Sequence, residues 1–357
     1  MKKRMAALVL GMALAGTVFA GTAMADEGGT IKVGFALKTL KEPYFVKMVD
    51  TLKEECAARG WEFSSLTADD DTVKEAENIE AFITQGVDVL FLDSVDPDAC
   101  IPSIDLAAEA GIPVINLDSD VNGGNYVTTV YSDNLENGRM AGNAYIEWLN
   151  ENGRSDEEII AILISGTKGN VAGGERRDGL MAGMIQGRTG CNDEEAYAAA
   201  EGMEEQLVAS GKAEYEEAKL KIVGQGWGNW VIEEGLTASE DFITANPDVN
   251  VILGENDQML FGAQTALENA GLTGVALLAA ADGAQDAYDL IRENATADNP
   301  YIATGLNSPV LVVEQGMEIA EQIVVDKVPW DAFDKVTKTE AAAITVDNVD
   351  DWYDVGF

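Results

Sequence analysis

Short runs of β-forming residues alternate with longer helical segments along most of this chain. In its first part the predicted strands cover residues 31–37, 87–93, 112–118 and 125–131, and the predicted helices cover 43–59, 72–85 and 97–110. Two of these helices stop at a glycine, Gly60 or Gly111, which adopts the left-handed backbone conformation of a helix end without strain. Such alternation predicts a parallel sheet with helices packed on its faces.

A second series of the same kind begins near Leu135. Its predicted strands cover 159–165, 220–225, 250–254, 275–280 and 301–304, and its helices 135–151, 171–186, 230–246, 257–271 and 283–293. A last helix, 308–326, and a strand near 341–346 follow. With 357 residues, 46% of them apolar, the chain can bury two domain cores. We therefore predict an α/β fold of two doubly wound parallel sheets.

The stretch between Gly187 and Lys219 interrupts this alternation. It is acidic and rich in alanine, and it contains no proline and no low-complexity repeat. These features predict an extra solvated helix rather than a linker. No function is predicted for it.

The first residues have the pattern of a secretory signal peptide. Lys2, Lys3 and Arg4 precede a short apolar run that ends in the small residues of Ala23-Met24-Ala25. We expect residues 1–25 to be cleaved, and no cysteine lies near the cleavage site for lipid attachment. The longest later apolar run, residues 275–281, is far shorter than the roughly 20 residues of a membrane helix. The sequence thus predicts export to the periplasm or the medium.

Charge and composition exclude several classes of protein. The chain has 63 acidic residues, 23 basic residues and no histidine, a net charge of -40. Nucleic acid is excluded as a partner because its phosphates would be repelled. The missing histidine removes Ser-His-Asp and Cys-His catalysis and histidine zinc sites, and it leaves carboxylates, lysines and tyrosines as candidate catalysts.

No metal, cofactor or disulfide is predicted. DSDVNG at 118–123 matches the start of a calcium loop, but its twelfth position is Thr129 where a bidentate glutamate is needed. No phosphate-binding G-x-x-x-x-G-K-[ST] motif occurs, and GQGWGN has Asn229 in place of the third glycine of a dinucleotide fingerprint. Three unevenly spaced cysteines, Cys56, Cys100 and Cys191, do not form a disulfide framework, and Cys56 is predicted to lie in the core.

Polar and aromatic residues follow the predicted strands. In open α/β sheets the ligand lies beyond the carboxyl ends of the strands. The residues there are Lys38, Glu42, Tyr44, Phe45, Asp93, Asp118, Glu255, Asn256, Asp257, Asp282 and Asn307, with Trp227 and Trp230 in a glycine-rich loop. Carboxylates and amides pair with vicinal hydroxyls, and an aromatic ring covers the C–H face of a sugar. An Asp or Asn after a strand is also a common helix cap, so the prediction of a sugar site rests on their convergence.

The order of several motifs is similar to one family. The motifs are KTLKEPYFVKM, INLDSD, YSDNLENGRMAG, ERRDGL, NPDVNVILGENDQMLFGA and the ADG after LLAA. In this order they resemble the periplasmic sugar-binding proteins of the ribose and galactose type, the solute receptors of ABC importers. The resemblance implies two similar lobes joined by three crossovers, near Ser132-Asp133, Asn307-Ser308 and 340–343. The lobes would then comprise 26–132 with 308–341, and 133–307 with 342–357.

The resemblance also implies roles for individual residues. It places an aromatic pair on Tyr44 and Phe45, carboxylates on Asp118 and Asp282, a guanidinium on Arg176, a stacking ring on Trp230, and amides on Asn256 and Asn307. This chain departs from the ribose branch at Ser119, where that branch has an arginine, and at Lys38 and Glu42, where it has a serine and an amide. The choice among pentose, hexose and polyol therefore stays open.

The sequence thus favours a non-enzymatic, monomeric receptor that delivers a monosaccharide or polyol to an ABC permease. One alternative is a sensor that docks on a chemoreceptor or sensor kinase. A second is a secreted carboxylate glycoside hydrolase, with Asp118 and Asp282 as acid and base.

Overall fold

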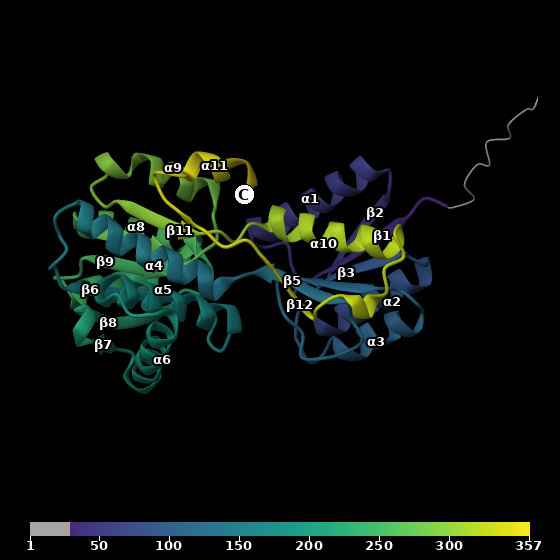
Figure 1. The fold of residues 1–357 in the computed structure, drawn as a ribbon, viewed down its shortest axis with the longest axis horizontal. Coiled ribbons are helices and arrows are strands. Elements are labelled where there is room, and N and C mark those ends of the chain that lie inside the picture. The colour runs from purple at the N-terminus through teal and green to yellow at the C-terminus, as the bar shows by residue number, and fades with distance from the viewer. Residues whose placement is uncertain (1–28) are drawn as a thin grey trace, which may run out of the picture.

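The computed structural model describes residues 29–357, so the predicted signal peptide lies outside the described residues. The chain forms two lobes, each built around its own sheet (Figure 1). The strands of the first sheet are β1 (Lys32–Leu37), β2 (Glu62–Thr67), β3 (Val89–Asp93), β4 (Val114–Leu117), β5 (Thr128–Ser132) and β12 (Val336–Thr339). They are parallel and lie in the order β12-β5-β4-β3-β1-β2.

The second sheet repeats this arrangement. Its strands are β6 (Ile159–Ser165), β7 (Ala213–Tyr215), β8 (Leu220–Trp227), β9 (Val251–Gly254), β10 (Ala276–Ala279), β11 (Tyr301–Gly305) and β13 (Ala343–Ile344). The order is β13-β11-β10-β9-β6-β8-β7, and only the edge strands β7 and β13 are antiparallel to their neighbours. In the first sheet β1 lies between β2 and β3, and in the second β6 lies between β8 and β9, so the strand order reverses there and opens a crevice at the carboxyl ends of these strands. The predicted fold of two similar doubly wound lobes is confirmed.

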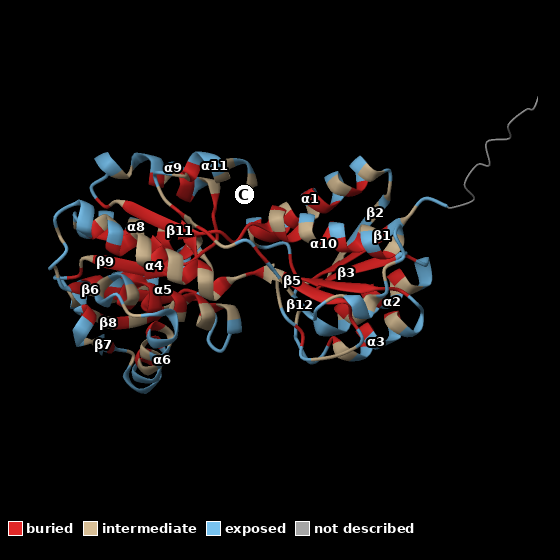
Figure 2. Cartoon of the chain, viewed as in Figure 1, coloured by how far each residue is buried: buried red, intermediate tan, exposed pale blue. Residues whose placement is uncertain are grey.

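Helices cover both faces of each sheet. They are α1 (Pro43–Arg59), α2 (Thr72–Gln85), α3 (Ile101–Glu109), α4 (Asn134–Glu151), α5 (Val171–Thr189), α6 (Asp193–Ser210), α7 (Ile232–Ala245), α8 (Asp257–Ala270), α9 (Gln285–Glu293), α10 (Pro309–Val324) and α11 (Val349–Trp352). In the first lobe α1 and α10 form one core layer and α2 and α3 the other. In the second, α4, α5 and α6 share one layer and α7, α8 and α9 the other. The strands between them are the most buried part of each lobe (Figure 2).

Glycines bring α4 and α5 unusually close together. A Cβ atom on Gly183 of α5 would lie 2.0 Å from the backbone oxygen of Arg139, and one on Gly179 would lie 2.2 Å from that of Leu135. Gly138 of α4 faces the α5 backbone in the same way. Side chains at these positions would therefore push the two helices apart.

Most predicted elements occur within a few residues of their expected bounds, and the differences have local causes. Helix α7 begins at Ile232 because Asn229 and Trp230 have positive φ angles of 43° and 70°, which helices do not contain. The predicted helix 97–110 starts only at Ile101. It follows a turn in which the backbone amides of Asp98 and Ala99 donate to the Asp96 carboxylate. The strand near 341–346 shrinks to β13, and the edge strand β12 was not predicted.

The acidic stretch 187–219 forms α6, followed by the unpredicted strand β7. The prediction of a solvated helix is wrong for one face of α6. Ala196, Ala200, Met203 and Leu207 are buried in the core layer shared with α5. Their spacing of three and four residues places them on one stripe of the helix, and the acidic residues occupy the other faces.

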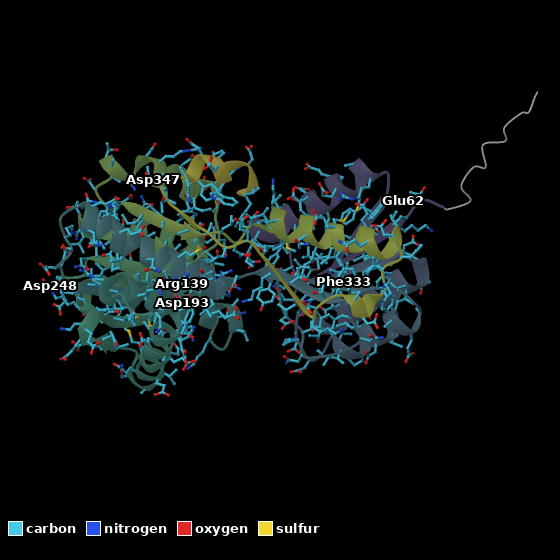
Figure 3. The ribbon with its side chains drawn as sticks, viewed as in Figure 1. Glu62, Arg139, Asp193, Asp248, Phe333 and Asp347 are labelled. Atoms are coloured by element: carbon cyan, nitrogen blue, oxygen red, sulfur yellow. The ribbon has the colours of Figure 1, made fainter. Side chains whose placement is uncertain are left out.

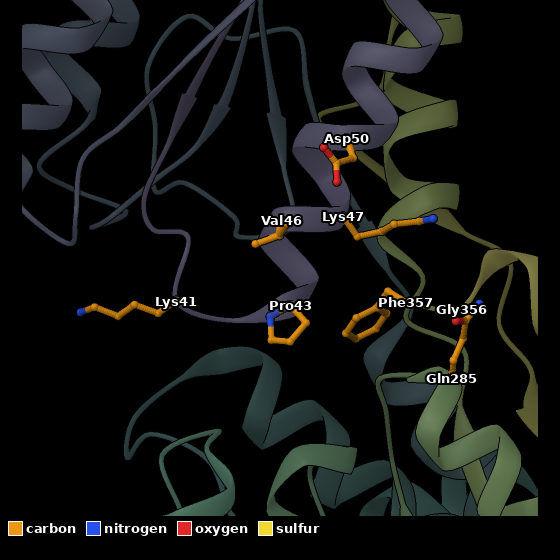
Figure 4. A pocket seen from close by; sticks show the side chains of 8 residues that line it. All are labelled: Lys41, Pro43, Val46, Lys47, Asp50, Gln285, Gly356 and Phe357. Carbon is orange, nitrogen blue, oxygen red and sulfur yellow. The ribbon is translucent and has the colours of Figure 1, made fainter.

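The chain passes between the two sheets three times, after β5, after β11 and after β12. After α11 the chain packs on the second lobe, and its C-terminal end lies between the lobes (Figure 1). The ring of Phe357 packs against apolar residues of both lobes, and it meets Tyr44 edge to face at 5.4 Å between centroids. Beside Phe357, a recess of about 450 Å³ separates Pro43 and Lys47 of the first lobe from Gln285 of the second (Figure 4).

Cys56, Cys100 and Cys191 are free, and Cys56 is fully buried as predicted. Cys56 and Cys100 lie in the core layers on opposite faces of the first sheet.

Candidate functional site

Three strand ends of the first lobe meet at Lys38. Its Nζ atom lies 3.1 Å from Asp93 Oδ1 and 3.3 Å from Asp118 Oδ2, and it donates to Ser119 Oγ at 2.9 Å. These contacts can occupy all three ammonium protons. Burial acts to lower the pKa of Lys38, but the charges of Asp93 and Asp118 outweigh it and raise the pKa above its usual value. Lys38 is therefore a charged residue that holds together the loops after β1, β3 and β4.

The loop after β1 also carries the predicted residues Glu42, Tyr44 and Phe45. The hydroxyl of buried Tyr44 donates to Asn307 Oδ1 at 3.2 Å. The ring of Phe45 lies under Lys38, with Nζ 4.4 Å from its centroid, and otherwise packs in the first-lobe core. Glu42 precedes α1 without capping it, and its buried Oε2 has no hydrogen-bond partner among the described residues. Burial raises the pKa of Glu42. Its Oε2 is thus a buried acceptor without a partner among the described residues.

Arg176 organises the second lobe's half of the site. Its Nη1 lies 2.9 Å from Asp282 Oδ1 and donates to the backbone oxygen of Glu255 at 3.2 Å. Its Nε donates to Asn134 Oδ1 at 2.9 Å. Asn307 donates from Nδ2 to Asp282 Oδ1 at 3.0 Å. A continuous chain of contacts thus runs from Tyr44 through Asn307 and Asp282 to Arg176.

Asp257 fixes the loop that carries Asp282. Its Oδ2 accepts from the backbone amides of Asp282, Gly283 and Ala284 at 3.2, 2.8 and 2.8 Å. Tyr301 donates its hydroxyl to Asp257 Oδ1 at 2.6 Å. Asp257 is fully buried, and these donors satisfy both of its oxygens.

Trp230 follows β8 and lies beside Arg176, whose Cζ is 5.5 Å from the ring centroid. The indole rests on the backbone of Gly166, where an added Cβ would be only 2.1 Å from Cζ2. Asn256 donates to the Trp230 carbonyl at 3.3 Å and also accepts from Met259 N as the cap of α8. Trp230 has a left-handed φ angle of 70°, which costs energy for a residue with a large side chain, and Asp118 has one of 65°, which aspartate adopts more readily. Strain of this kind concentrates at functional sites.

The structure therefore brings the residues proposed from sequence into two charged groups, around Lys38 and around Arg176. Among residues 29–357, hydrogen bonds join Tyr44 of the first lobe through Asn307 to the group around Arg176. Sequence reasoning placed Asp93 at a strand end without including it in the site. It missed Asn134, which caps no helix and is signalled only by its place in YSDNLENG. Ser119, where this chain departs from the ribose branch, accepts from Lys38.

Glu75 of α2 is a buried carboxyl close enough to Lys38 to feel its charge. Its Oε2 accepts from Val95 N at 2.6 Å. Burial raises its pKa to about 7, with Asp96 adding to the effect and Val95 N–H and Lys38 opposing it. The stability that follows from a raised carboxyl pKa is present below about pH 4.5 and is lost as pH rises toward 7.

We expect Glu75→Gln, which keeps an acceptor for Val95, to reduce the loss of stability between pH 4.5 and pH 8 by about 2–3 kcal/mol. Urea denaturation at the two pH values measures this difference. Glu77→Gln, on the same helix but exposed, is the control and should leave the pH dependence unchanged. Parallel pH curves for Glu75→Gln and the unmodified protein would contradict the assignment.

Within residues 29–357, no cluster of three or more potential metal ligands is found. In the same part of the chain, no helix is both long enough and apolar enough to cross a bilayer.

Comparison with known proteins identifies the class. Residues 33–327 match the family model of the periplasmic binding protein domain, and the chain belongs to this family. This confirms the resemblance found in the sequence motifs. Among its relatives is the ribose import binding protein of Salmonella typhimurium, 27% identical over 321 residues, which cover 90% of this chain and 92% of the relative.

Two solved structures have the same fold. A solute-binding protein of an ABC transporter from Mycobacterium smegmatis, with bound glycerol, is 26% identical and has a TM-score of 0.70, with 92% of this chain and 98% of that chain covered. A periplasmic solute-binding protein of an ABC transporter from Actinobacillus succinogenes, with bound D-allose, is 23% identical and has a TM-score of 0.72, with 90% and 100% covered. The relatives are transport binding proteins, the class to which the fold and the site also point.

Proposed function

We propose that this protein is the substrate-binding protein of an ABC sugar importer, and that it captures a monosaccharide or polyol between its lobes. The observation that carries the proposal is the polar chain from Tyr44 through Asn307 to Asp282 and Arg176. It links the first lobe, a crossover and the second lobe at the carboxyl ends of both sheets. The relative that imports ribose and the glycerol-bound neighbour support a polyhydroxylated ligand.

The site offers both senses of hydrogen bond. Glu42 Oε2, buried in the first lobe, is an acceptor without a partner among the described residues. Arg176 Nη2 makes no hydrogen bond within the described residues, which leaves donors in the second lobe. In this arrangement one sugar hydroxyl donates to Glu42 and another accepts from Arg176, while the Trp230 ring covers the C–H face of the sugar. A ligand that contacts both lobes favours the closed arrangement over the open one.

We also propose that residues 26–132 with 308–341 form the first lobe, and 133–307 with 342–357 the second, with the boundaries at the three crossovers. We propose export through cleavage of residues 1–25, function outside the cytoplasmic membrane without a lipid anchor, and delivery to a permease by a monomer. No residue is assigned a catalytic role. The arrangement leaves open a sensory role in which the closed protein docks on a chemoreceptor.

A panel of pentoses, hexoses and polyols, including D-ribose, D-allose and glycerol, tests the proposal. Titration calorimetry and melting shifts of the purified protein should identify at least one ligand. Absence of heat and of a melting shift across the whole panel would reject the proposal. Release of a cleaved product from glycosides would instead favour the hydrolase with Asp118 and Asp282 as acid and base.

Replacing Trp230 by alanine should weaken binding of the panel ligand by about 1–3 kcal/mol, because stacking on the sugar is lost. Asp118→Ala should cost a similar amount and also leaves Lys38 with one carboxylate partner fewer. Trp148→Ala is a control, since Trp148 stacks on Tyr145 in the core layer away from the site. Calorimetric affinities that stay unchanged in the first two variants would show that the site is misplaced.

A further inference from the structure

Helix α6 and strand β7 lie between α5 and β8, whereas at the corresponding place in the first lobe α1 is followed directly by β2. The first turns of α6 contact α4 through an ion pair and a hydrogen bond. Asp193 lies near Arg139, with 3.7 Å between Oδ1 and Nη1 (Figure 3). Tyr197 donates its hydroxyl to Glu136 at 3.3 Å. These contacts fix one end of the inserted helix on the second lobe.

Further along α6, an ion pair points toward the binding cleft. Glu204 holds the guanidinium of Arg177 with both carboxylate oxygens, and Nε donates to Oε2 at 2.7 Å. Arg177 also donates from Nη1 to Glu255 Oε1 at 3.1 Å. A two-oxygen contact of this kind holds the guanidinium in one orientation. Arg177 thus connects the inserted helix to a carboxylate that is only 1% exposed.

Glu255 in turn holds the backbone on which Trp230 rests. Its Oε2 accepts from Gly166 N at 2.7 Å. The indole of Trp230 packs on Gly166, and a Cβ on Gly173 would lie 2.6 Å from Glu255 Oε2 and 3.1 Å from the indole. Any displacement of the Glu255 carboxylate would therefore move the surface beneath the indole.

The two adjacent arginines of α5 contact different carboxylates. Arg176 faces the cleft and binds Asp282, and Arg177, about 100° further around α5, faces α6. Both contact Glu255, one through its backbone oxygen and the other through its side chain. Burial raises the pKa of Glu255, and the charge of Arg177 opposes that rise. Arg177 and the Gly166 amide thus both hold the Glu255 carboxylate in place.

We propose that the inserted helix α6 positions Trp230: Glu204 holds Arg177, Arg177 holds Glu255, and Glu255 holds the Gly166 backbone that supports the indole. Glu204 and Arg177 are positioning residues, because neither touches the indole. The inference rests on the proposed function in taking Trp230 as a sugar-stacking residue. It gives the acidic stretch, which sequence analysis left unexplained, a role in the binding cleft.

The test compares Glu204→Gln with Glu205→Gln in the full chain. Both changes remove one negative charge from α6, but Glu205 is exposed and makes no hydrogen bond or ion pair to another described residue. The first measurement is acrylamide quenching of Trp230 fluorescence in the ligand-free protein, obtained by subtracting the signal of the matching variant with Trp230→Phe. The second is the affinity for the panel sugar that gives the largest melting shift.

Glu204→Gln should make Trp230 more accessible to acrylamide and weaken sugar affinity about three- to tenfold, while Glu205→Gln changes neither. Arg177→Lys keeps the charge beside Glu255 but cannot hold both Glu204 oxygens, and it should reproduce the effect. Equal quenching in Glu204→Gln, Arg177→Lys and the unmodified protein would overturn the proposal. The quenching measurement needs no ligand, so it decides the positioning role even if no sugar binds.

Discussion

Replacing Arg176 by methionine is expected to weaken sugar binding by a factor of about a hundred or more. The side chain is only 8% exposed, and its removal leaves Asp282, itself 11% exposed, without its cation. It also leaves Asn134 Oδ1 without a donor. Breaking one partner of a buried charge pair costs more than the contact itself, because the other charge stays desolvated. Titration calorimetry with the panel sugar measures the loss.

The same variant should lower the free energy of unfolding by about 3–5 kcal/mol, which urea denaturation measures. Arg154→Met is the matched control. Arg154 forms a similar pair with Glu157 but lies before β6, at the end of the sheet away from the site, and is 28% exposed. It should lose less stability and keep full affinity. Arg176→Met with unchanged affinity would remove Arg176 from the site.

Two glycine-to-alanine changes are expected to act in opposite directions. In Gly183→Ala the new methyl group would lie 2.0 Å from the backbone oxygen of Arg139 and 2.9 Å from the backbone nitrogen of Asn143, so α4 and α5 must separate. We expect a loss of about 3 kcal/mol of stability. Gly202, inside α6, has no atom within 4 Å of an added Cβ, and Gly202→Ala should gain about 0.5–1 kcal/mol.

Urea denaturation of both variants measures these changes. Separation of α4 and α5 should also weaken sugar binding, because the two helices carry Asn134 and Arg176, whose side chains are 2.9 Å apart. Gly202→Ala should leave binding unchanged. A stable Gly183→Ala protein with full affinity would show that the helices can move apart without disturbing the site.

The strand ends illustrate how far the sequence led toward the site. Asp118 and Asp282 were identified because parallel strands of one sheet end at the same edge, so a polar residue after each strand is close to the others. Arg176 lies inside a helix, where no strand-end rule applies, and its role came from the family resemblance. Asn134 was missed because its contact with Arg176 depends on how closely α4 approaches α5.

Edge elements were the least predictable part of the fold. Strand β12 has four residues, VTKT, with no apolar alternation, and it is a strand because β5 pairs with it. The buried stripe on α6 follows the spacing of its apolar residues, but the acidic residues around it give the segment the composition of a solvated helix. In both cases a neighbouring element decided the outcome.

By itself the sequence determined the α/β class, the two series of strands and helices, and the polar strand ends, because these depend on periodicity within a few residues. The tertiary structure decided which charges pair: Lys38 with Asp93 and Asp118, Arg176 with Asp282. It also decided that an inserted acidic helix reaches toward Trp230 through Arg177. Such pairings join residues far apart in the chain, and their geometry is set by strand order and helix packing, which local patterns do not encode.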